Sequence, residues 1–443
     1  RMVLIVCIPI VIQNGFTNLA SLLDNIMIGQ LGTLSMSGVS ISNQLFQVFN
    51  VSVFGAMSGA GIFLAQFYGR GNRDGVHNCF RIKMLLGLLI SILAICIFKI
   101  LGPSLISLYL NDDPTASLTT LNFGKQYMDV MLIGLIPFAI TQVFSSSLRE
   151  TGNTVLPMKA SVIAVIVNFC INYILIFGHF GFPKLGVIGA AIGTVVSRIV
   201  EMGINIAAGL NNNYLRDAMR LDKISGDIFK NVVKRGMPLL CNEILWSISI
   251  ALISQCYSTR GLSAVAAINV TTTVTNFFMI ICYAMGNSIS IIVGQRLGAG
   301  EIEYAKDCDL KMVFMNFMMC LCIGVALFLC SSFIPQIYNT SIEVKALATS
   351  LLRVSACMLP IISLYYSSYF TMRAGGKTLL TFFFDSGYTF MFTFMVALCL
   401  TRFTNLPIFN VYLLVQCVDI PKAVLGITLV KKGIWVHNIV NEL

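Results

Sequence analysis

Long hydrophobic stretches separated by short polar segments run through the whole 443-residue chain. A stretch of about 18 or more apolar residues is typical of a helix that crosses the hydrocarbon core of a bilayer. No charged residue occurs between Asp24 and Arg70 or between Arg260 and Arg296, and each gap is long enough for a helix, an uncharged turn and a second helix. The pattern predicts an all-α membrane protein with twelve transmembrane helices. We expect these helices at about residues 3–28, 38–66, 81–101, 127–148, 156–178, 186–209, 232–256, 265–295, 310–334, 346–370, 379–401 and 408–430.

Composition agrees with this pattern. Charged residues make up 11% of the chain and hydrophobic residues 57%, whereas a soluble domain has roughly a quarter charged residues. Twelve helices and their loops leave no room for a sizeable soluble domain. The fourteen cysteines include no CxxC pair, and most lie in apolar stretches, where a free thiol packs as a small hydrophobic group. We therefore predict no cofactor, and no metal site other than one for a coupling ion.

The distribution of Lys and Arg predicts the orientation in the membrane. Twelve spans place both termini on one side, and most of the 29 Lys and Arg residues fall in loops on that side. Because cytoplasmic loops carry an excess of these residues, we expect a multi-pass protein of the plasma (inner) membrane with both termini in the cytoplasm. The net charge of +10 then reflects topology, and a nucleic-acid partner is not expected. The exceptions on the opposite side are Lys99, Lys125, Lys184, Arg260, Lys345, Arg353 and Arg402.

The two halves of the chain repeat the same spacing of Gly, Pro and Gln residues. After a shift of 229 residues the matching pairs include Pro9 with Pro238, Gly32 with Gly261, Gln66 with Gln295, and Gly69 with Gly298. A shift of 224 matches Asp129 with Arg353 and Arg149 with Arg373. We predict a tandem duplication with an N-lobe over residues 1–210, a cytoplasmic linker over 211–231 and a C-lobe over 232–443. Paired bundles of this kind are a common transporter plan, although a purely structural duplication is the alternative.

Polar side chains inside the predicted helices indicate a cation site in the first half. A carboxylate in a helix bundle is costly, so Asp24 in the first span is a candidate functional group. Asn168 and Asn172 are four residues apart and face the same way. Together with the Thr194 hydroxyl, they offer the oxygen ligands that hard cations prefer. The alternatives are that Asp24 reaches interfacial water and that the two amides only join helices by hydrogen bonds.

The second half contains two further acids within its predicted helices. Glu243 lies about eight residues, or roughly 12 Å, beyond Arg235, so it is too deep to pair easily with loop lysines. Asp385 corresponds to Ser161 of the first half, and it either faces a cavity or pairs with a base on the cytoplasmic side. Both are candidates for a C-lobe cation or substrate site. Arg198 and Glu201 are three residues apart on one helix, and we expect them to pair with each other.

Six segments, in this order along nearly the whole chain, resemble the multidrug and toxic compound extrusion (MATE) family. They are Asp24–Gly32, Gln66–Gly71, Leu148–Thr154, Gly186–Thr194, Gly294–Gly300 and Arg373–Thr378. The resemblance implies two six-helix lobes related by pseudo-two-fold symmetry. It also implies an antiporter that exports small organic, often cationic, molecules by alternating access while sodium ions or protons enter. A monomer is expected, with a small-molecule substrate and the lipid bilayer as partners.

The resemblance also assigns the N-lobe ion site to Asp24, Asn168, Asn172 and Thr194. Asn172 stands where many relatives have Asp. An amide cannot titrate, so any proton bound at this site must bind to the Asp24 carboxylate. A sodium ion, in contrast, would still find the oxygen ligands and one negative charge to compensate its own. This departure favours sodium over protons.

Two other classes of protein are less compatible with the chain. The three histidines lie outside the predicted helices, and no HExxH or nucleotide-binding loop occurs, so we do not expect an enzyme. The alternative function is a flippase for lipid-linked precursors with the same two-lobe plan. Such a protein is expected to carry several cavity-facing Arg or Lys residues for a pyrophosphate, whereas the charges deep in these spans are mostly acidic.

Overall fold

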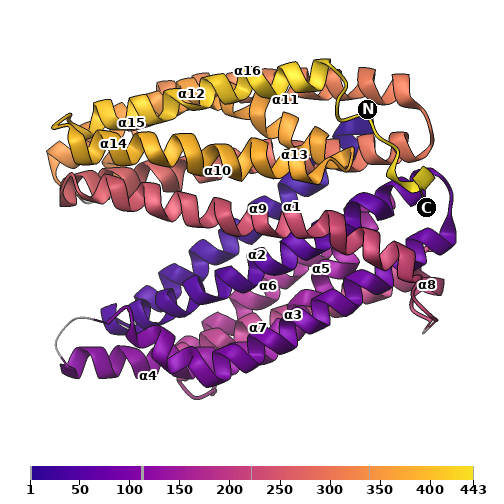
Figure 1. The fold of residues 1–443 in the computed structure, drawn as a ribbon. Coiled ribbons are helices and arrows are strands. Elements are labelled where there is room, and N and C mark those ends of the chain that lie inside the picture. The colour runs from indigo at the N-terminus through magenta and orange to yellow at the C-terminus, as the bar shows by residue number, and fades with distance from the viewer. Residues whose placement is uncertain (1, 111–113, 221, 339, 443) are drawn as a thin grey trace. The chain divides into compact units, whose positions relative to one another are not determined.

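The computed structural model describes residues 2–110, 114–220, 222–338 and 340–442, which form an all-helical fold without strands in these ranges (Figure 1). Twelve helical spans in the described residues are long and apolar enough to cross a membrane. The predicted fold class is therefore confirmed. Each predicted span overlaps one of the observed spans, but several helices extend beyond the predicted ends. Arg1 and Leu443, the outer limits of the two predicted lobes, lie outside the described residues.

The first half of the chain supplies six of the spans. Its helices are α1 (Met2–Gly29), α2 (Thr33–Gly69), α3 (Arg73–Ser107), α4 (Pro114–Met131), η1 (Leu132–Gly134), α5 (Leu135–Glu150), α6 (Val155–Phe177), α7 (Val187–Leu210) and the short α8 (Leu215–Ala218). The 3₁₀ turn η1 joins α4 and α5 into one span. In a 3₁₀ turn each amide bonds to the carbonyl three residues before it, so the α-helical hydrogen-bond pattern is interrupted. This interruption forms part of the site described below.

The second half supplies the other six spans. Its helices are α9 (Gly226–Ser258), α10 (Leu262–Gly298), α11 (Ile302–Cys330), η2 (Ile334–Ile337), α12 (Ile342–Ala374), α13 (Thr378–Phe382), η3 (Phe383–Gly387), η4 (Thr389–Phe394), α14 (Met395–Phe403), α15 (Ile408–Cys417), α16 (Asp419–Lys431) and η5 (Ile439–Glu442). Both η3 and η4 are π-helical and lie within a single span with α13 and α14. Helices α2 and α10 each have 37 residues, which is about 55 Å and longer than a bilayer core requires.

The chain divides into two compact units whose boundaries cut across the sequence halves. The first unit comprises Ile8–Leu64 and Asn72–Val232. The second comprises the described residues within Arg1–Cys7, Ala65–Gly71 and Val233–Leu443. The last turns of α2 therefore belong to the second unit, although they come from the first repeat.

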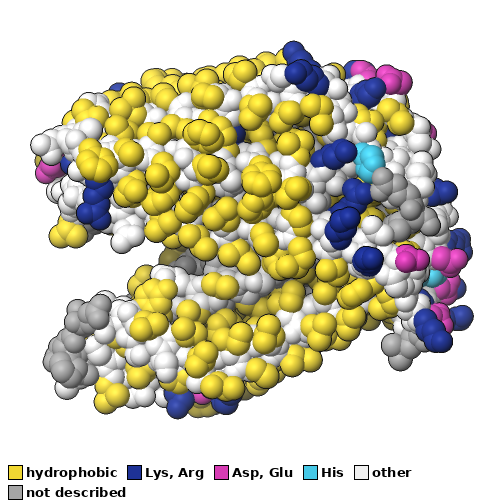
Figure 2. Space-filling view, viewed as in Figure 1, with side chains coloured by type: hydrophobic (Ala, Val, Ile, Leu, Met, Phe, Trp, Pro, Cys, Tyr) yellow, Lys and Arg dark blue, Asp and Glu magenta, His cyan; other side chains and the backbone are white. Residues whose placement is uncertain are grey.

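The surface of each unit suits a lipid environment. Hydrophobic side chains cover most of the visible helical faces, whereas Lys and Arg gather mainly near the helix ends (Figure 2). Large apolar residues such as Ile100, Leu262 and Phe403 are highly exposed. In lipid this exposure carries no penalty, while the backbone groups stay satisfied within the helices.

A close backbone contact in the second unit explains one of the repeated motifs. A Cβ atom on Gly69 would lie 1.8 Å from the Gln295 carbonyl oxygen, and one on Gly298 would lie 1.9 Å from the Gln66 carbonyl oxygen. The repeat-related Gly and Gln residues thus pack the ends of α2 and α10 against each other reciprocally. The buried Gln66 side chain also donates to the Ala374 carbonyl oxygen (3.0 Å) and accepts from the Ile439 amide (2.9 Å).

Gly298→Val should destabilise this contact. The added side chain must displace the backbone of α2, which costs about 1–3 kcal/mol in a packed core. We expect a lower unfolding temperature in detergent than for the wild-type protein. Gly203→Val is a matched control, because no atom lies within 4 Å of a Cβ placed at Gly203. Equal unfolding temperatures for the two variants would contradict this account of the repeated glycines.

Candidate functional site

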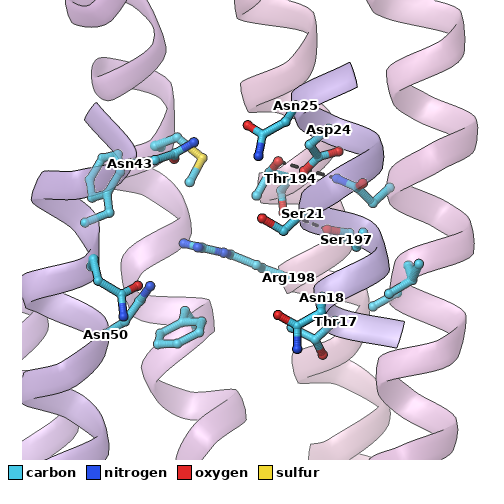
Figure 3. A pocket seen from close by; sticks show the side chains of 18 of the residues that line it. Thr17, Asn18, Ser21, Asp24, Asn25, Asn43, Asn50, Thr194, Ser197 and Arg198 are labelled. Carbon is cyan, nitrogen blue, oxygen red and sulfur yellow. Dashed lines mark hydrogen bonds between the residues drawn. The ribbon is translucent and has the colours of Figure 1, made fainter. Parts of the chain in front are cut away.

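The first unit contains an open cavity of about 620 Å³ (Figure 3). Side chains from α1, α2, α4, α5, α6 and α7 line it, so it is built from helices distant in the sequence. Asp24, Asn168 and Thr194 are among the lining residues, and Asn172 lies directly behind them. The cavity therefore contains the site that the sequence predicted for a cation.

A chain of hydrogen bonds joins the four predicted N-lobe residues. The Asn172 Nδ2 donates to Asp24 Oδ1 (2.6 Å) and to Asn168 Oδ1 (3.3 Å). The Asn168 Nδ2 donates to Thr194 Oγ1 (3.4 Å), which itself donates to the Ala190 carbonyl oxygen. These side chains come from α1, α6 and α7 and meet as the sequence reasoning expected. The Asp24 carboxylate faces these side chains.

The orientation of Asn172 determines what this network can bind. Its amide nitrogen, and not its oxygen, faces the Asp24 carboxylate. Its Oδ1 is buried without a hydrogen-bond partner in the described part of the chain and lies where a Cβ on Gly193 would collide with it, at 2.0 Å. A hard cation requires oxygen ligands. The arrangement is therefore a hydrogen-bonded network that would have to turn the Asn172 amide before its oxygen could coordinate an ion.

Arg198 and Glu201 do not pair with each other as expected. Within the described residues, no ion pair of 4 Å or less joins them. Instead the Arg198 guanidinium donates to the Gly134 carbonyl oxygen (3.3 Å), at the 3₁₀ turn η1, and lies 4.9 Å above the Phe138 ring. Glu201 accepts from the Ser161 hydroxyl. The expectation failed because helical spacing brings two residues to one face but does not exclude better partners on neighbouring helices.

The sequence analysis missed several polar residues of this cavity. Asn43, Gln47 and Asn50 of α2 all line it. Their spacing of four and three residues places them on one face of a helix. A row of amides on one face of a span without charged residues is the signal that indicates them.

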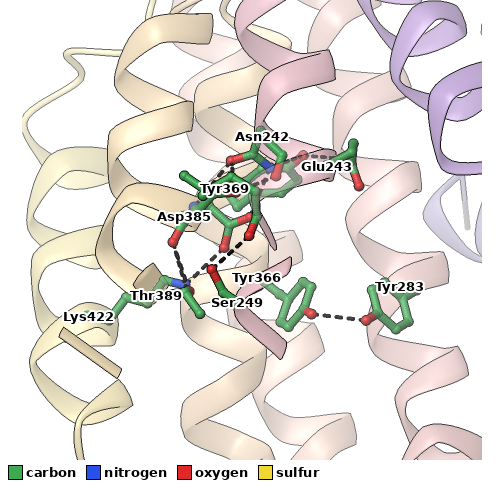
Figure 4. A network of polar contacts seen from close by, with 11 residues as sticks. Asn242, Glu243, Ser249, Tyr283, Tyr366, Tyr369, Asp385, Thr389 and Lys422 are labelled. Carbon is green, nitrogen blue, oxygen red and sulfur yellow. Dashed lines mark hydrogen bonds and ion pairs between the residues drawn. The ribbon is translucent and has the colours of Figure 1, made fainter. Parts of the chain in front are cut away.

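A second polar network lies in the second unit (Figure 4). The Tyr369 hydroxyl donates to Glu243 Oε1 (3.1 Å). The Asn242 Nδ2 lies 3.5 Å from the Tyr369 hydroxyl and donates to Asp385 Oδ2 (3.1 Å). The two predicted C-lobe acids are thus connected through Tyr369 and Asn242, neither of which the sequence analysis selected.

Asp385 pairs with a buried lysine. The Lys422 Nζ lies 2.9 Å from Asp385 Oδ1 and 3.2 Å from the Thr389 hydroxyl, and the Lys422 side chain is only 3% exposed. It also lies 4.5 Å above the Tyr365 ring, at a distance typical of a cation–π contact. Of the two alternatives for Asp385, the structure shows the one with a basic partner. That partner is Lys422 of α16, inside the bundle and not in a loop.

Asp385 and Ser386 lie in the π-helical turn η3, and Ser386 extends this network. The Ser386 amide donates to Asn242 Oδ1 (3.2 Å), and the Ser386 hydroxyl donates to the same oxygen (2.6 Å). A π-helical turn moves backbone groups out of the regular helical ladder, and such turns are frequent at functional sites. In the described part of the chain, no group of three or more His, Cys, Asp or Glu residues is placed to hold a metal ion.

Comparison with known proteins identifies a family and a fold. The MatE family model matches residues 9–174 and 238–399. The probable multidrug resistance protein NorM of Thermotoga maritima is 26% identical over 84% of this chain and 79% of its own length. The multidrug resistance protein MdtK of Pectobacterium atrosepticum is 23% identical over 79% of this chain and 76% of its own length. A crystal structure of MATE in complex with MaL6 superimposes with a TM-score of 0.86 and 20% identity, over 97% of this chain and 95% of that chain.

The buried ion pair predicts the effect of replacing Lys422. Lys422→Met leaves Asp385 buried without its charged partner, which costs about 3–5 kcal/mol. We expect a clear fall in the unfolding temperature measured in detergent. The double variant Lys422→Met/Asp385→Asn removes both charges and should recover at least half of that loss. If the double variant is no more stable than the single one, the two side chains do not act as an ion pair.

Proposed function

The chain belongs to the MatE family, whose members are transporters, and we propose that it exports small organic molecules across the plasma membrane in exchange for sodium ions or protons. The observation that carries this proposal is the 620 Å³ cavity that contains Asp24 and its amide neighbours. The names of the two relatives, both multidrug resistance proteins, support export of foreign or waste compounds.

The coupling ion is proposed to bind at Asp24. Asp24 is the carboxylate of the Asn168–Asn172–Thr194 network. The Asn172 Oδ1 has no hydrogen-bond partner in the described residues and can serve as a further oxygen ligand for the ion. When a sodium ion arrives, the Asn172 amide turns, its Oδ1 joins Asp24 on the ion, and its hydrogen bond to the carboxylate is lost. Since the site has a single carboxylate among neutral ligands, we favour sodium over protons as the coupling ion.

Coupling requires that the ion and the substrate prefer different states. A ligand can shift a conformational equilibrium only by its differential affinity for the two states. In the proposed alternating-access cycle, sodium at Asp24 favours one access state and substrate favours the other. We propose that the protein works as a monomer. We also propose that both termini lie in the cytoplasm, which the excess of Lys and Arg in the loops on the side of the termini supports.

Glu243 is proposed as the carboxylate of the second unit that binds cations. Asp385 already has Lys422 within 2.9 Å, so its charge is balanced inside the protein. Glu243 makes a hydrogen bond with the Tyr369 hydroxyl but has no comparable ion pair within 4 Å in the described residues. It is therefore the carboxylate of this pair that can accept a cationic substrate group or a second ion, and Asp385 contributes through Asn242.

The flippase alternative has weaker support. A lipid-linked pyrophosphate requires several basic side chains in the cavity. Among the described residues that line the cavity, Arg198 is the only base, and it is accompanied by Asp24 and Glu201. A net negative cavity would repel a pyrophosphate.

Export assays test the assignment of the ion site. Vesicles containing the protein are loaded with ethidium or a zwitterionic rhodamine, and export is followed under an imposed sodium gradient and then a proton gradient. Asp24→Asn and Asn168→Ala should each reduce gradient-driven export by at least about tenfold, since a hydrogen bond or ligand contact to a charged group contributes about 1.5–3 kcal/mol. Asn14→Ala, on the same helix but outside the network, serves as the control. Normal export by Asp24→Asn under either gradient would show that the site is elsewhere.

Asn172→Asp should change the coupling ion. A second carboxylate beside Asp24 creates like-charge repulsion that a bound proton relieves. We expect export driven by a proton gradient to rise relative to export driven by a sodium gradient, by about tenfold if the repulsion amounts to about 1.4 kcal/mol. The ratio of the two initial rates, measured on the same vesicles, gives the result. An unchanged ratio would exclude Asn172 as a determinant of ion choice.

A further inference from the structure

The lining of the cavity in the first unit is unusually polar for a drug site. Ligand pockets are lined mainly by hydrophobic and aromatic side chains with a few polar groups. Here most of the lining residues carry an amide, a hydroxyl or a charged group. Among the described residues that line the cavity, the apolar ones are Ala20, Phe46, Met131, Phe138, Ala164 and Val165.

Besides Asn168 of α6, amide groups face the cavity from α1 and α2. Asn18 and Asn25 of α1 and Asn43 and Asn50 of α2 line it, and all four are labelled in Figure 3. The Asn50 Oδ1 is buried and has no hydrogen-bond partner in the described residues. A ligand without hydrogen-bonding groups would displace water from these amides and leave them unpaired, at a cost of about 1–3 kcal/mol for each group. The lining therefore favours a hydrophilic ligand.

Arg198 extends across the cavity toward the side that carries Asn43 and Asn50 (Figure 3). In the described part of the chain, its guanidinium makes one hydrogen bond, to the Gly134 carbonyl oxygen. The guanidinium carbon lies 4.9 Å from the centre of the Phe138 ring, and the side chain lines the cavity. A guanidinium edge is a planar array of donors that fits a carboxylate with two parallel hydrogen bonds.

The internal repeat explains why Arg198 lacks an acidic partner. The shift of 224 residues that matches Arg149 with Arg373 also matches Arg198 with Lys422, and Ser161 with Asp385. In the second unit the acid Asp385 holds the base Lys422 at 2.9 Å. In the first unit the position of that acid is the neutral Ser161, whose hydroxyl is bound to Glu201. The repeat thus keeps the base and replaces the fixed anion with a neutral residue, so Arg198 can pair with an anion that enters the cavity.

We propose that this cavity binds a hydrophilic zwitterion of the amino-acid or short-peptide type, whose carboxylate is held by Arg198 and whose ammonium group faces the acidic side chains Asp24 and Glu201. This inference rests on the proposed export function and names the class of substrate for the first unit. The carboxylate replaces the anion that Asp385 supplies in the second unit. The hydroxyls and amides of the lining bind the polar remainder of the ligand.

The test compares ligands that differ in one charge. Alanylglutamine is a zwitterion, its methyl ester lacks the carboxylate, and tetraphenylphosphonium is a lipophilic cation. Each is titrated into the full-length protein in nanodiscs, and its apparent dissociation constant is taken from the rise in unfolding temperature. We expect alanylglutamine to bind at least about tenfold more tightly than its methyl ester, as the loss of a charge-assisted, two-point contact requires.

Variants assign the effect to Arg198. Arg198→Gln should weaken the binding of alanylglutamine by at least about tenfold. Arg198→Lys should weaken this binding by less, because lysine keeps the charge but lacks the planar pair of donors. Neither variant should change the response to tetraphenylphosphonium. Arg216→Gln, in the short helix α8 and outside the cavity, should behave as the wild type. Sodium titration in the same samples, with Asp24→Asn as reference, reports the ion site separately, so failure of the zwitterion proposal is distinguishable from failure of the antiport proposal.

The proposal is overturned if alanylglutamine does not stabilise the wild-type protein at millimolar concentration, or if its methyl ester binds as tightly. It is also overturned if Arg198→Gln binds the dipeptide normally, or if it loses dipeptide and tetraphenylphosphonium equally. The last result would assign a purely structural role to the contact between Arg198 and Gly134.

Discussion

A charged side chain within a bilayer must find its partner inside the protein, and the polar interior of this chain is arranged around that requirement. In the first unit the Asp24 carboxylate accepts a hydrogen bond from a neutral amide, that of Asn172, at 2.6 Å. In the second unit the Asp385 carboxylate has a permanent cationic partner, Lys422, at 2.9 Å. An amide compensates a negative charge only in part, whereas an ammonium group compensates it fully. The two units therefore differ in how much of their negative charge is left for an ion from outside.

This difference arose within a duplicated framework. With the repeat shifts of 229 and 224 residues, the four residues of the Asp24 network correspond to apolar residues in the second half: Ile253, Phe392, Val396 and Val418. Conversely, the Asp385–Lys422 pair corresponds to Ser161 and Arg198 in the first half. The framework that both halves share is the helix packing, as in the reciprocal contact of Gly69 and Gly298. The polar groups have diverged so that each half keeps a different set of charges.

The divergence supports a division of work between the units. A carboxylate beside a cavity whose negative charge is only partly balanced by the protein can exchange its amide partner for an ion. Coupling to an ion requires such an exchange. A lysine held by a carboxylate, a threonine hydroxyl and an aromatic ring is fixed in place. Asn242 lies between Asp385, in the π-helical turn η3, and Tyr369. It thereby connects the Asp385–Lys422 pair to Glu243. In this view the first unit supplies the site at which an ion can bind and leave. The second unit supplies a fixed Asp385–Lys422 ion pair near Glu243.

The sequence by itself determined the class of the molecule. Hydrophobic stretches of membrane length predicted the twelve spans, because burial in lipid demands long apolar helices whatever their neighbours are. The spacing of Asn168 and Asn172 and the cost of a buried acid at Asp24 were enough to predict a cluster that the structure brings together. These properties are local, or depend only on the solvent around the helix.

Only the tertiary structure decided which partner each polar group has. Arg198 binds the Gly134 carbonyl and not Glu201, and Asp385 binds Lys422 from a helix about forty residues away in sequence. Helical periodicity states which residues share a face, but it does not state which neighbouring helix that face meets or at what rotation. The polar lining of the cavity depends on five spans rotated so that their amides and hydroxyls converge. That rotation is fixed by packing over the whole unit, and for this reason it could not be read from any one segment of the chain.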